Sequence, residues 1–381
     1  MILTQCAVCA TELGLTLGKK CGRCSTRYCG AACQVQHWKE GGHDKLCKPI
    51  KRAGGAEQHN ANQKYTVAVA VAAEACAEDT KGQTCYICTQ ALHWKTKECL
   101  VRGCACRGTA GFAHVSCLAE QAKILVAEAE ANNLGVKVLD ERLNRWHTCS
   151  LCEQGYHGVV RCALGWACWK TYVGRPETDQ LRIPAINLLG NGLHESGQYE
   201  DSLSVMEAEL AMKRRLGVSE HSILVVQSNL ASTYSCLGRQ ENAVRMLRDV
   251  YSGNLRLKGE ENGTTLLAAN NYAFTLIVVR RFEEAKSLLR KTIPVARRVL
   301  DNNEETTLRM RMNYAKALYA DDDATLDHLR EAVTTLEEIE RTARRVFGGA
   351  HPVATQTATS LRNARTALRA RETPPTSKSQ N

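Results

Sequence analysis

The first 47 residues of the chain carry eight thiol and imidazole side chains that are spaced in pairs. In order, the pairs are Cys6 and Cys9, Cys21 and Cys24, Cys29 and Cys33, and His43 and Cys47. A Cys-x2-Cys turn directs two sulfurs at one ion, and ligands four positions apart share one face of a helical turn. Eight ligands are enough for two tetrahedral Zn²⁺ sites, so this segment predicts two zinc ions.

A second set of eight ligands follows between residues 85 and 152. The pairs are Cys85 and Cys88, Cys104 and Cys106, His114 and Cys117, and Cys149 and Cys152. Four cysteines therefore precede the histidine and three follow it. This set predicts two further ions, which makes four Zn²⁺ for the whole chain.

The 19 cysteines could instead form disulfides, but the rest of the sequence favours metal. The N-terminus lacks the charged stretch and apolar core of a signal peptide, and the C-terminus shows no lipidation signal. We therefore expect a reducing compartment, the cytoplasm or the nucleus. Both cysteine-rich segments also look too poor in apolar residues to build a core, so metal binding is expected to supply their folding free energy.

The formal net charge of +10 overstates how basic the chain is. Fourteen ligand thiolates and four Zn²⁺ would lower it to about +4, and charges in the stretch 176–371 are nearly balanced. These values argue against nucleic acid as a partner, and the lack of an eighteen-residue apolar window argues against the membrane. Five unpaired cysteines are expected to be small buried hydrophobic residues: Cys76, Cys99, Cys162, Cys168 and Cys236.

The stretch YCGAACQVQHWKEGGHDKLC at 28–47 resembles the MYND zinc finger. The resemblance implies two interleaved sites, one formed by Cys6, Cys9, Cys29 and Cys33 and the other by Cys21, Cys24, His43 and Cys47. It also implies a groove for short proline-containing peptides that is lined by Gln34 and Trp38. Trp38 could equally pack against the zinc core, and His37 lies off the ligand spacing.

The second set resembles the RING-CH finger, because a CxC pair stands seven residues before the histidine. The resemblance implies one site at Cys85, Cys88, His114 and Cys117 and another at Cys104, Cys106, Cys149 and Cys152. Ile87 would contact a ubiquitin-conjugating enzyme. The 31 residues between Cys117 and Cys149, which indicate a helix with a break near 132–135, and the acidic Glu153 depart from that pattern. An active ligase and a RING-like scaffold both remain open.

The C-terminal half repeats itself with a period of about 42 residues. Similar turn sequences stand at 197–202, 238–243 and 280–285, and Leu188, Asn229, Asn271 and Asn313 follow one another at intervals of 41, 42 and 42 residues. A fixed period of this length indicates a solenoid of helix pairs, because one pair cannot bury its apolar face alone. Recurring alanines are expected at the closest helix contacts.

These repeats, in particular HSILVVQSNLASTYSCLG at 221–238, resemble tetratricopeptide repeats of the kinesin-light-chain type. The resemblance implies a concave groove for peptides. Asn229, Asn271 and Asn313 would face that groove, with Arg309 and Lys316 nearby as groups that recognise acidic side chains. The alternative is that these asparagines are helix-surface residues or local caps.

The sequence therefore predicts a mostly α-helical protein with two small zinc-stabilised modules followed by a helical solenoid. The expected divisions are a MYND-type finger at 1–50, a linker with a short helix at 51–82, a RING-CH-like finger at 83–158, repeats at 159–371 and a disordered tail at 372–381. The predicted function is an adaptor that binds other proteins through short peptides. The alternative is a RING-type E3 ubiquitin ligase, and whether the chain is an enzyme stays open.

Overall fold

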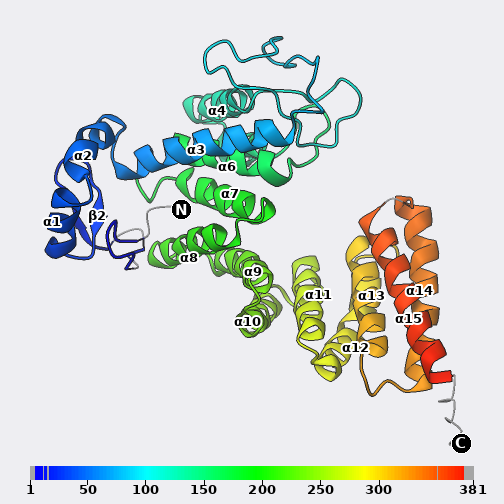
Figure 1. Cartoon of the computed structure of the whole chain (residues 1–381). Helices are drawn as coiled ribbons and strands as arrows, with labels where there is room; N and C mark the ends of the chain where they lie inside the picture. Colours follow the sequence, from blue (N-terminus) through cyan, green and yellow to red (C-terminus); the bar gives the residue numbers. More distant parts are fainter. Residues whose placement is uncertain (1–4, 12, 15–16, 350, 373–381) are drawn as a thin grey trace, which may run out of the picture. The chain divides into compact units, whose positions relative to one another are not determined.

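The structure is a computed structural model that describes residues 5–11, 13–14, 17–349 and 351–372. The chain divides into two compact units, Met1–Ser219 and Glu220–Asn381. Most of the described residues are helical, and the short strands lie in the first unit (Figure 1). None of the described helices combines the length and the apolar character that a membrane span requires. The tail expected at 372–381 lies outside the described residues, apart from Glu372.

The first unit holds a two-stranded hairpin, a short 3-10 helix and eight α-helices within its described residues. They are β1 (Lys19–Lys20), β2 (Arg27–Tyr28), α1 (Ala31–Lys39), α2 (His43–Arg52), α3 (Ala56–Ala75), α4 (Val115–Ala131), α5 (Gly135–Leu143), η1 (Asn144–Trp146), α6 (Gly158–Tyr172), α7 (Arg182–Glu195) and α8 (Tyr199–Arg215). The strands are antiparallel, with Lys19 opposite Tyr28. The interruption between α4 and α5 falls where the sequence predicts a break.

One hydrophobic core joins the second cysteine-rich module to the helices around it. Helix α3 packs on α6, α6 on α7, and α4 on α6 (Figure 1). Leu100, Phe112 and Trp146 of the module are buried in the same cluster as Trp166 and Trp169 of α6. The expectation treated this segment as a separate module and missed the core that it shares with its neighbours. Its few apolar residues do not form a core alone, but they complete one that α3, α6 and α7 supply.

Helix α3 is longer than the short helix expected in this region. It begins at Ala56, inside the stretch interpreted as a linker, and it runs for 20 residues. Ala61 and Ala72 on one face are fully buried. The first half of α3 is rich in polar residues, so the sequence did not indicate its buried face. That face is determined by contacts with distant parts of the chain.

Helices α6 and α7 approach each other closely because each contributes a glycine to the contact. A Cβ atom added to Gly165 of α6 would lie 3.0 Å from the carbonyl oxygen of Leu188. One added to Gly192 of α7 would lie 2.9 Å from the carbonyl oxygen of Arg161. Two glycines inside helices cost helix propensity, but here they let two backbones come into contact.

The second unit, where it is described, is a series of antiparallel helices. They are α9 (Glu220–Cys236), α10 (Gln240–Lys258), α11 (Gly263–Val278), α12 (Phe282–Val299), α13 (Glu305–Tyr319), α14 (Leu326–Phe347) and α15 (Pro352–Glu372). Consecutive helices pack on each other, and so do α11 and α13. The recurring alanines are fully buried where the helices meet: Ala231, Ala243, Ala273, Ala285 and Ala315. This arrangement is the repeat solenoid that the period predicts.

Candidate metal clusters and peptide groove

The first finger brings its eight predicted ligands together in two groups of four. In each group the ligand atoms lie within 4.8 Å of one another: Cys6, Cys9, Cys29 and Cys33 in one, and Cys21, Cys24, His43 and Cys47 in the other. The Sγ atoms of Cys9 and Cys29 are 3.4 Å apart, and those of Cys21 and Cys47 are 3.9 Å apart. Sulfurs bound tetrahedrally at the usual Zn–S length stand about 3.8 Å apart, so both groups fit Zn²⁺.

Short elements position these ligands. Cys21 and Cys24 lie in the turn that joins β1 to β2, and Cys29 follows β2 directly. His43 and Cys47 occupy successive turns of α2. Cys33 lies in α1, but Cys29 precedes the helix. The expectation that these two cysteines share a helical turn is therefore only half right, because Gly30 is extended and starts the helix after Cys29.

The second module also forms two groups with ligand atoms within 4.8 Å. They are Cys85, Cys88, His114 and Cys117, and Cys104, Cys106, Cys149 and Cys152. Nδ1 of His114 lies 3.4 Å from Sγ of Cys88 and 3.6 Å from Sγ of Cys117. Sγ of Cys106 is 3.8 Å from Sγ of Cys149. The ligands alternate between the two groups along the chain, so each ion would tie together segments that are distant in sequence.

The surroundings of two ligands, Cys9 and His114, favour the protonation state that binds metal. The Thr11 hydroxyl, 3.0 Å from Sγ of Cys9, helps lower the pKa of that thiol to about 6. Burial lowers the pKa of His114, which keeps the ring neutral at pH 7. Nε2 of His114 lies 3.3 Å from the carbonyl oxygen of Ala91. That contact holds Nδ1 toward the sulfurs, in the way that outer hydrogen bonds orient metal ligands.

Gln34 and Trp38 lie on successive turns of α1. Gln34 is half-buried, and Trp38 is 44% exposed. The Trp38 ring also meets the ring of the ligand His43 edge to face at 5.8 Å. Trp38 therefore packs beside the zinc ligands and still offers a surface. His37 is outside the ligand group, and its Nδ1 lies 3.0 Å from the Tyr28 hydroxyl.

Three of the unpaired cysteines are buried as expected, namely Cys76, Cys162 and Cys168. Cys99 and Cys236 are exposed, so the expectation of burial is wrong for them. Cys99 lies in the loop before Leu100 and Cys236 at the last position of α9. Spacing alone could not show which way these side chains point.

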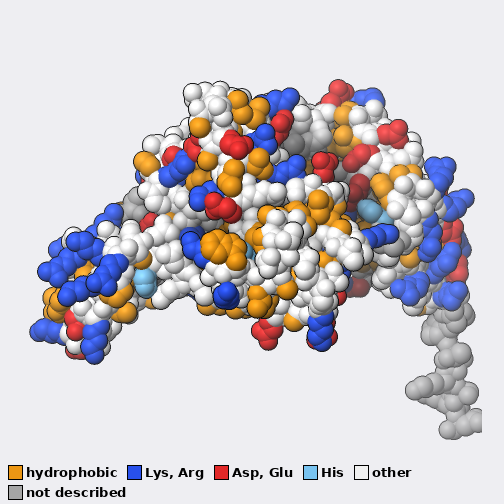
Figure 2. Space-filling model, turned by 90° about the horizontal axis from the view of Figure 1, so that it is seen from above, with side chains coloured by type: hydrophobic (Ala, Val, Ile, Leu, Met, Phe, Trp, Pro, Cys, Tyr) orange, Lys and Arg blue, Asp and Glu red, His pale blue; other side chains and the backbone are white. Residues whose placement is uncertain are grey.

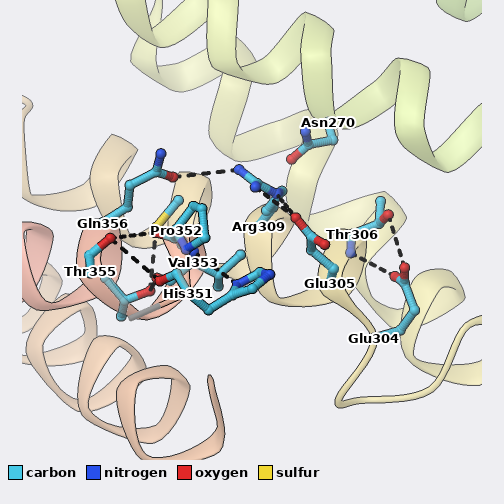
Figure 3. Close-up of polar contacts among 12 residues, drawn as sticks. Asn270, Glu304, Glu305, Thr306, Arg309, His351, Pro352, Val353, Thr355 and Gln356 are labelled. Carbon is cyan, nitrogen blue, oxygen red and sulfur yellow. Dashed lines mark hydrogen bonds and ion pairs between the residues drawn. The ribbon is translucent and has the colours of Figure 1, made fainter. Parts of the chain in front are cut away.

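The second unit contains a groove lined by alternate helices. A cavity of about 570 Å³ lies between α11, α13 and α15, and Asn271, Asn313, Arg309 and Lys316 all line it. Phe274, which is 46% exposed, contributes an apolar surface. Figure 3 shows Arg309 between Glu305, at 2.8 Å, and Gln356 of α15, at 3.5 Å. Lys316 makes no ion pair with any described residue, and its Nζ lies 5.4 Å from the centre of the Phe274 ring.

The asparagines do not play equal parts in this groove. Asn229 is not among the lining residues. Asn313 is buried, and its amide donates to Asn270 Oδ1 at 2.9 Å. Asn270, which sequence reasoning missed, also donates to Asn271 Oδ1 at 3.2 Å. The side-chain amide nitrogen of Asn271 has no hydrogen-bond partner in the described part of the chain, so it is the donor best placed for a ligand.

Comparison with known families identifies two parts of the chain. The family profile "MYND finger" matches residues 6–47. The profile "Tetratricopeptide repeat" matches residues 223–259 and 265–303, which correspond to the pairs α9–α10 and α11–α12. Among curated proteins, none matches the chain.

Several solved structures are similar to this chain at low sequence identity. The nearly identical TPR-like repeats of a Podosopora anserina protein described as a kinesin light chain are 21% identical, over 50% of this chain and 89% of that one, with a TM-score of 0.42. BtubC (BKLC) from P. vanneervenii is 14% identical, over 68% of this chain and 89% of that one, with a TM-score of 0.40. The TPR2AB domain of yeast Sti1, solved with pHSP90, is 14% identical over 65% and 98%, with a TM-score of 0.24.

The family matches and the geometry agree on the nature of the first finger and of the helix pairs α9–α10 and α11–α12. The match at 6–47 covers both ligand groups of the first finger, and the repeat matches cover helix pairs of the solenoid. The chain is therefore a protein that combines an N-terminal MYND zinc finger with tetratricopeptide repeats.

Proposed function

We propose that the protein is an adaptor that binds short segments of other proteins at two separate surfaces. One surface is the groove between α11, α13 and α15, and the other is the exposed side of the MYND finger around Trp38. The observation that carries the proposal is the groove itself. It is a cavity of about 570 Å³ that presents a side-chain amide, two cations and an exposed aromatic ring.

The groove chemistry fits a peptide with an acidic side chain next to an apolar one. Asn271 offers its amide to a peptide carbonyl, which is how a side chain can hold an extended backbone. Lys316 supplies the cation that no described carboxylate neutralises, whereas Arg309 is paired with Glu305. Phe274 provides the apolar surface.

The surface of the MYND finger is basic around its exposed apolar residues. Figure 2 shows Lys and Arg side chains gathered at the left of the view, over the part that holds α1 and α2. Exposed basic residues there include Lys39, Lys45, Lys48, Lys51 and Arg52. With Trp38 among them, the finger suits a proline-containing peptide that also carries acidic residues.

Peptide display against the full zinc-loaded chain tests the proposal. We expect two groups of selected peptides. One loses binding with Lys316→Ala or Asn271→Ala and is unaffected by Lys291→Ala, an exposed lysine of α12 outside the groove. The other loses binding with Trp38→Ala but not with the exposed neighbour Val35→Ala. The proposal would be refuted if the selected peptides bound Lys316→Ala, Asn271→Ala and Trp38→Ala as tightly as the unaltered chain.

Ubiquitin transfer stays an alternative prediction for the second module. Ile87 is 37% exposed and Leu151 is 51% exposed, and their loops are joined by a contact of 3.1 Å between the hydroxyls of Tyr86 and Ser150. The two side chains could form one apolar contact for a ubiquitin-conjugating enzyme. In vitro ubiquitination that disappears with Ile87→Ala would establish this activity, and its absence with a panel of conjugating enzymes would leave the adaptor role alone.

A further inference from the structure

A second cavity of the repeat unit is lined mainly by arginines. It has a volume of about 500 Å³ and lies where the end of α12, the turn after it, α13 and α14 meet. Four guanidinium groups line it, from Arg297, Arg311, Arg341 and Arg345, and Glu338 is its sole carboxylate among the described lining residues. The lining therefore carries a net charge of +3 from these five side chains.

This arginine cavity is separate from the peptide groove. The groove is lined by α11, α13 and α15, whereas the arginine cavity is lined by α12, α13 and α14. Helix α13 contributes to both, through Arg309 to the groove and through Arg311 to the cavity. Residues two positions apart on a helix point in widely different directions, so one helix serves two sites on different faces.

The positive charge of the cavity is poorly compensated. Arg311 has only 10% of its side chain exposed, and its ion pair is with Glu338 at 2.6 Å, a side chain that is 52% exposed. Burial, followed by the neighbouring charge of Arg297, lowers the pKa of the Arg311 guanidinium, while Glu338 opposes this shift. A buried cation beside a second cation and a half-exposed counter-ion is an arrangement that an added anion would stabilise.

The arginines next to the cavity are paired, whereas Arg297 and Arg345, which line it, are not. Arg298 pairs with Glu261 at 2.5 Å and Arg344 with Glu340 at 2.9 Å. Arg297 and Arg345, the adjacent residues that line the cavity, make no ion pair with any residue that the structure describes. Carboxylates therefore neutralise the two adjacent arginines, whereas Arg297 and Arg345 stay available to an anion.

We propose that this cavity binds a small molecule that carries at least two phosphate groups. Guanidinium groups bind phosphate oxygens through two parallel hydrogen bonds, and four of them converge here. A single phosphate group carries a charge of at most about −2, which would not neutralise the lining, whereas two phosphates would. Asn302, Asn303 and Thr342 add neutral donors for the remaining oxygens. The volume lies in the range of small-molecule sites.

Titration calorimetry of the full zinc-loaded chain at fixed ionic strength tests this proposal. The probes are inorganic phosphate, pyrophosphate and inositol hexakisphosphate. We expect pyrophosphate and inositol hexakisphosphate to bind more tightly than phosphate. The double variant Arg297→Gln with Arg345→Gln should weaken their binding by about tenfold or more, because it removes two charge-assisted contacts.

A charge-matched control separates a site from general attraction. Arg298→Gln with Arg344→Gln removes the same charge from adjacent, already paired positions, and should change binding by no more than about twofold. Equal weakening by both double variants, or no binding of any probe, would overturn the proposal. All four arginines are exposed, so folding should be preserved, which far-UV circular dichroism checks.

Further arms identify the source of the phosphates. Sedimentation with phosphatidylcholine vesicles that contain phosphatidylinositol bisphosphate shows whether the cavity also binds a lipid headgroup. If the free probes bind, the polyphosphate site is supported whether or not the chain sediments with the vesicles. A doubly phosphorylated peptide that binds when pyrophosphate does not would contradict a small-molecule site. Lys316→Ala in the peptide groove should leave probe binding unchanged, so failure of one site is distinguishable from failure of the other.

Discussion

The indole of Trp146 meets the phenol ring of Tyr172 edge to face, with ring centroids 5.9 Å apart and an angle of 77° between the planes. Trp146 stands three residues before the ligand Cys149, and Tyr172 is the last residue of α6. Both rings are almost fully buried. The second zinc module is therefore fastened to the helical part of the first unit by packing as well as by its ligands.

Replacing Trp146 with Ala should lower the free energy of unfolding of the first unit by about 3–5 kcal/mol, because it opens a cavity in the shared core. Thermal unfolding followed by circular dichroism measures the effect. Trp94→Ala is the matched control, since Trp94 is 68% exposed, and it should change the free energy by less than about 0.5 kcal/mol. Equal effects of the two variants would mean that the contact between Trp146 and α6 does not stabilise the unit.

Removal of zinc with a strong chelator should loosen the whole first unit and leave the second unit folded. The four ligand groups all lie in the first unit, and the second module shares its core with α3, α6 and α7. Hydrogen exchange of the full chain should show faster exchange in α3, α6 and α7 as well as in both zinc modules, with unchanged protection in α9–α15. If α6 and α7 keep full protection after chelation, the shared core does not couple the module to these helices.

The stability of the second unit should fall at acidic pH partly through Asp321. Its carboxylate lies 3.0 Å from Nζ of Lys286, a side chain that is 1% exposed. Burial opposes ionisation of Asp321, but the hydrogen bonds from Lys286 and from the Asp323 amide outweigh it and lower the pKa of the carboxyl. A depressed pKa means that the folded state holds the charged form more strongly. The contribution is therefore present above the ordinary aspartate pKa of about 4 and is lost as the pH falls further.

Asp321→Asn should accordingly cost about 2 kcal/mol at pH 7 and little at pH 2. Chemical unfolding monitored at the helical far-UV band, with chelator present at both pH values so that zinc release does not differ, measures the difference. Asp327→Asn is the control, because that side chain is 94% exposed. A cost that is the same at both pH values would rule out the charge of Asp321 as its origin.

Gly192→Ala should destabilise the first unit although alanine is the better helix former. The added methyl group would meet the backbone of α6 at Arg161 and Cys162, which cannot move away as a flexible side chain could. We expect a loss of about 1–3 kcal/mol by thermal unfolding. Gly22→Ala, where an added methyl meets nothing within 4 Å, should be nearly neutral. A stabilised Gly192→Ala variant would show that α6 and α7 can separate without cost.

The sequence predicts local features well, but it predicts poorly which distant helix packs against each surface. Spacing alone selected the ligand pairs, because short turns and helical steps encode them, and the resemblance to the two finger families implied the four groups that the structure assembles. The period of the repeats predicted the solenoid, because each helix pair repeats the same apolar face. The fully buried Ala61 in a stretch that reads as linker, and the closely packed Gly165 and Gly192, could not be predicted, since their roles depend on which distant helix they meet.

The groove shows the same division. The recurrence of Asn271 and Asn313 indicated residues on one helix face, and both line the cavity. The hydrogen bond that Asn313 donates to Asn270 depends on how α11 and α13 are rotated against each other. No periodic pattern encodes that rotation.

All five tryptophans of the chain, Trp38, Trp94, Trp146, Trp166 and Trp169, belong to the first unit. Indole fluorescence is therefore blind to the tetratricopeptide repeats and reports solely on the zinc-dependent part. Emission recorded on one sample would consequently follow the first unit alone and amide circular dichroism both units together, so a transition seen by circular dichroism and not by emission would belong to the second unit.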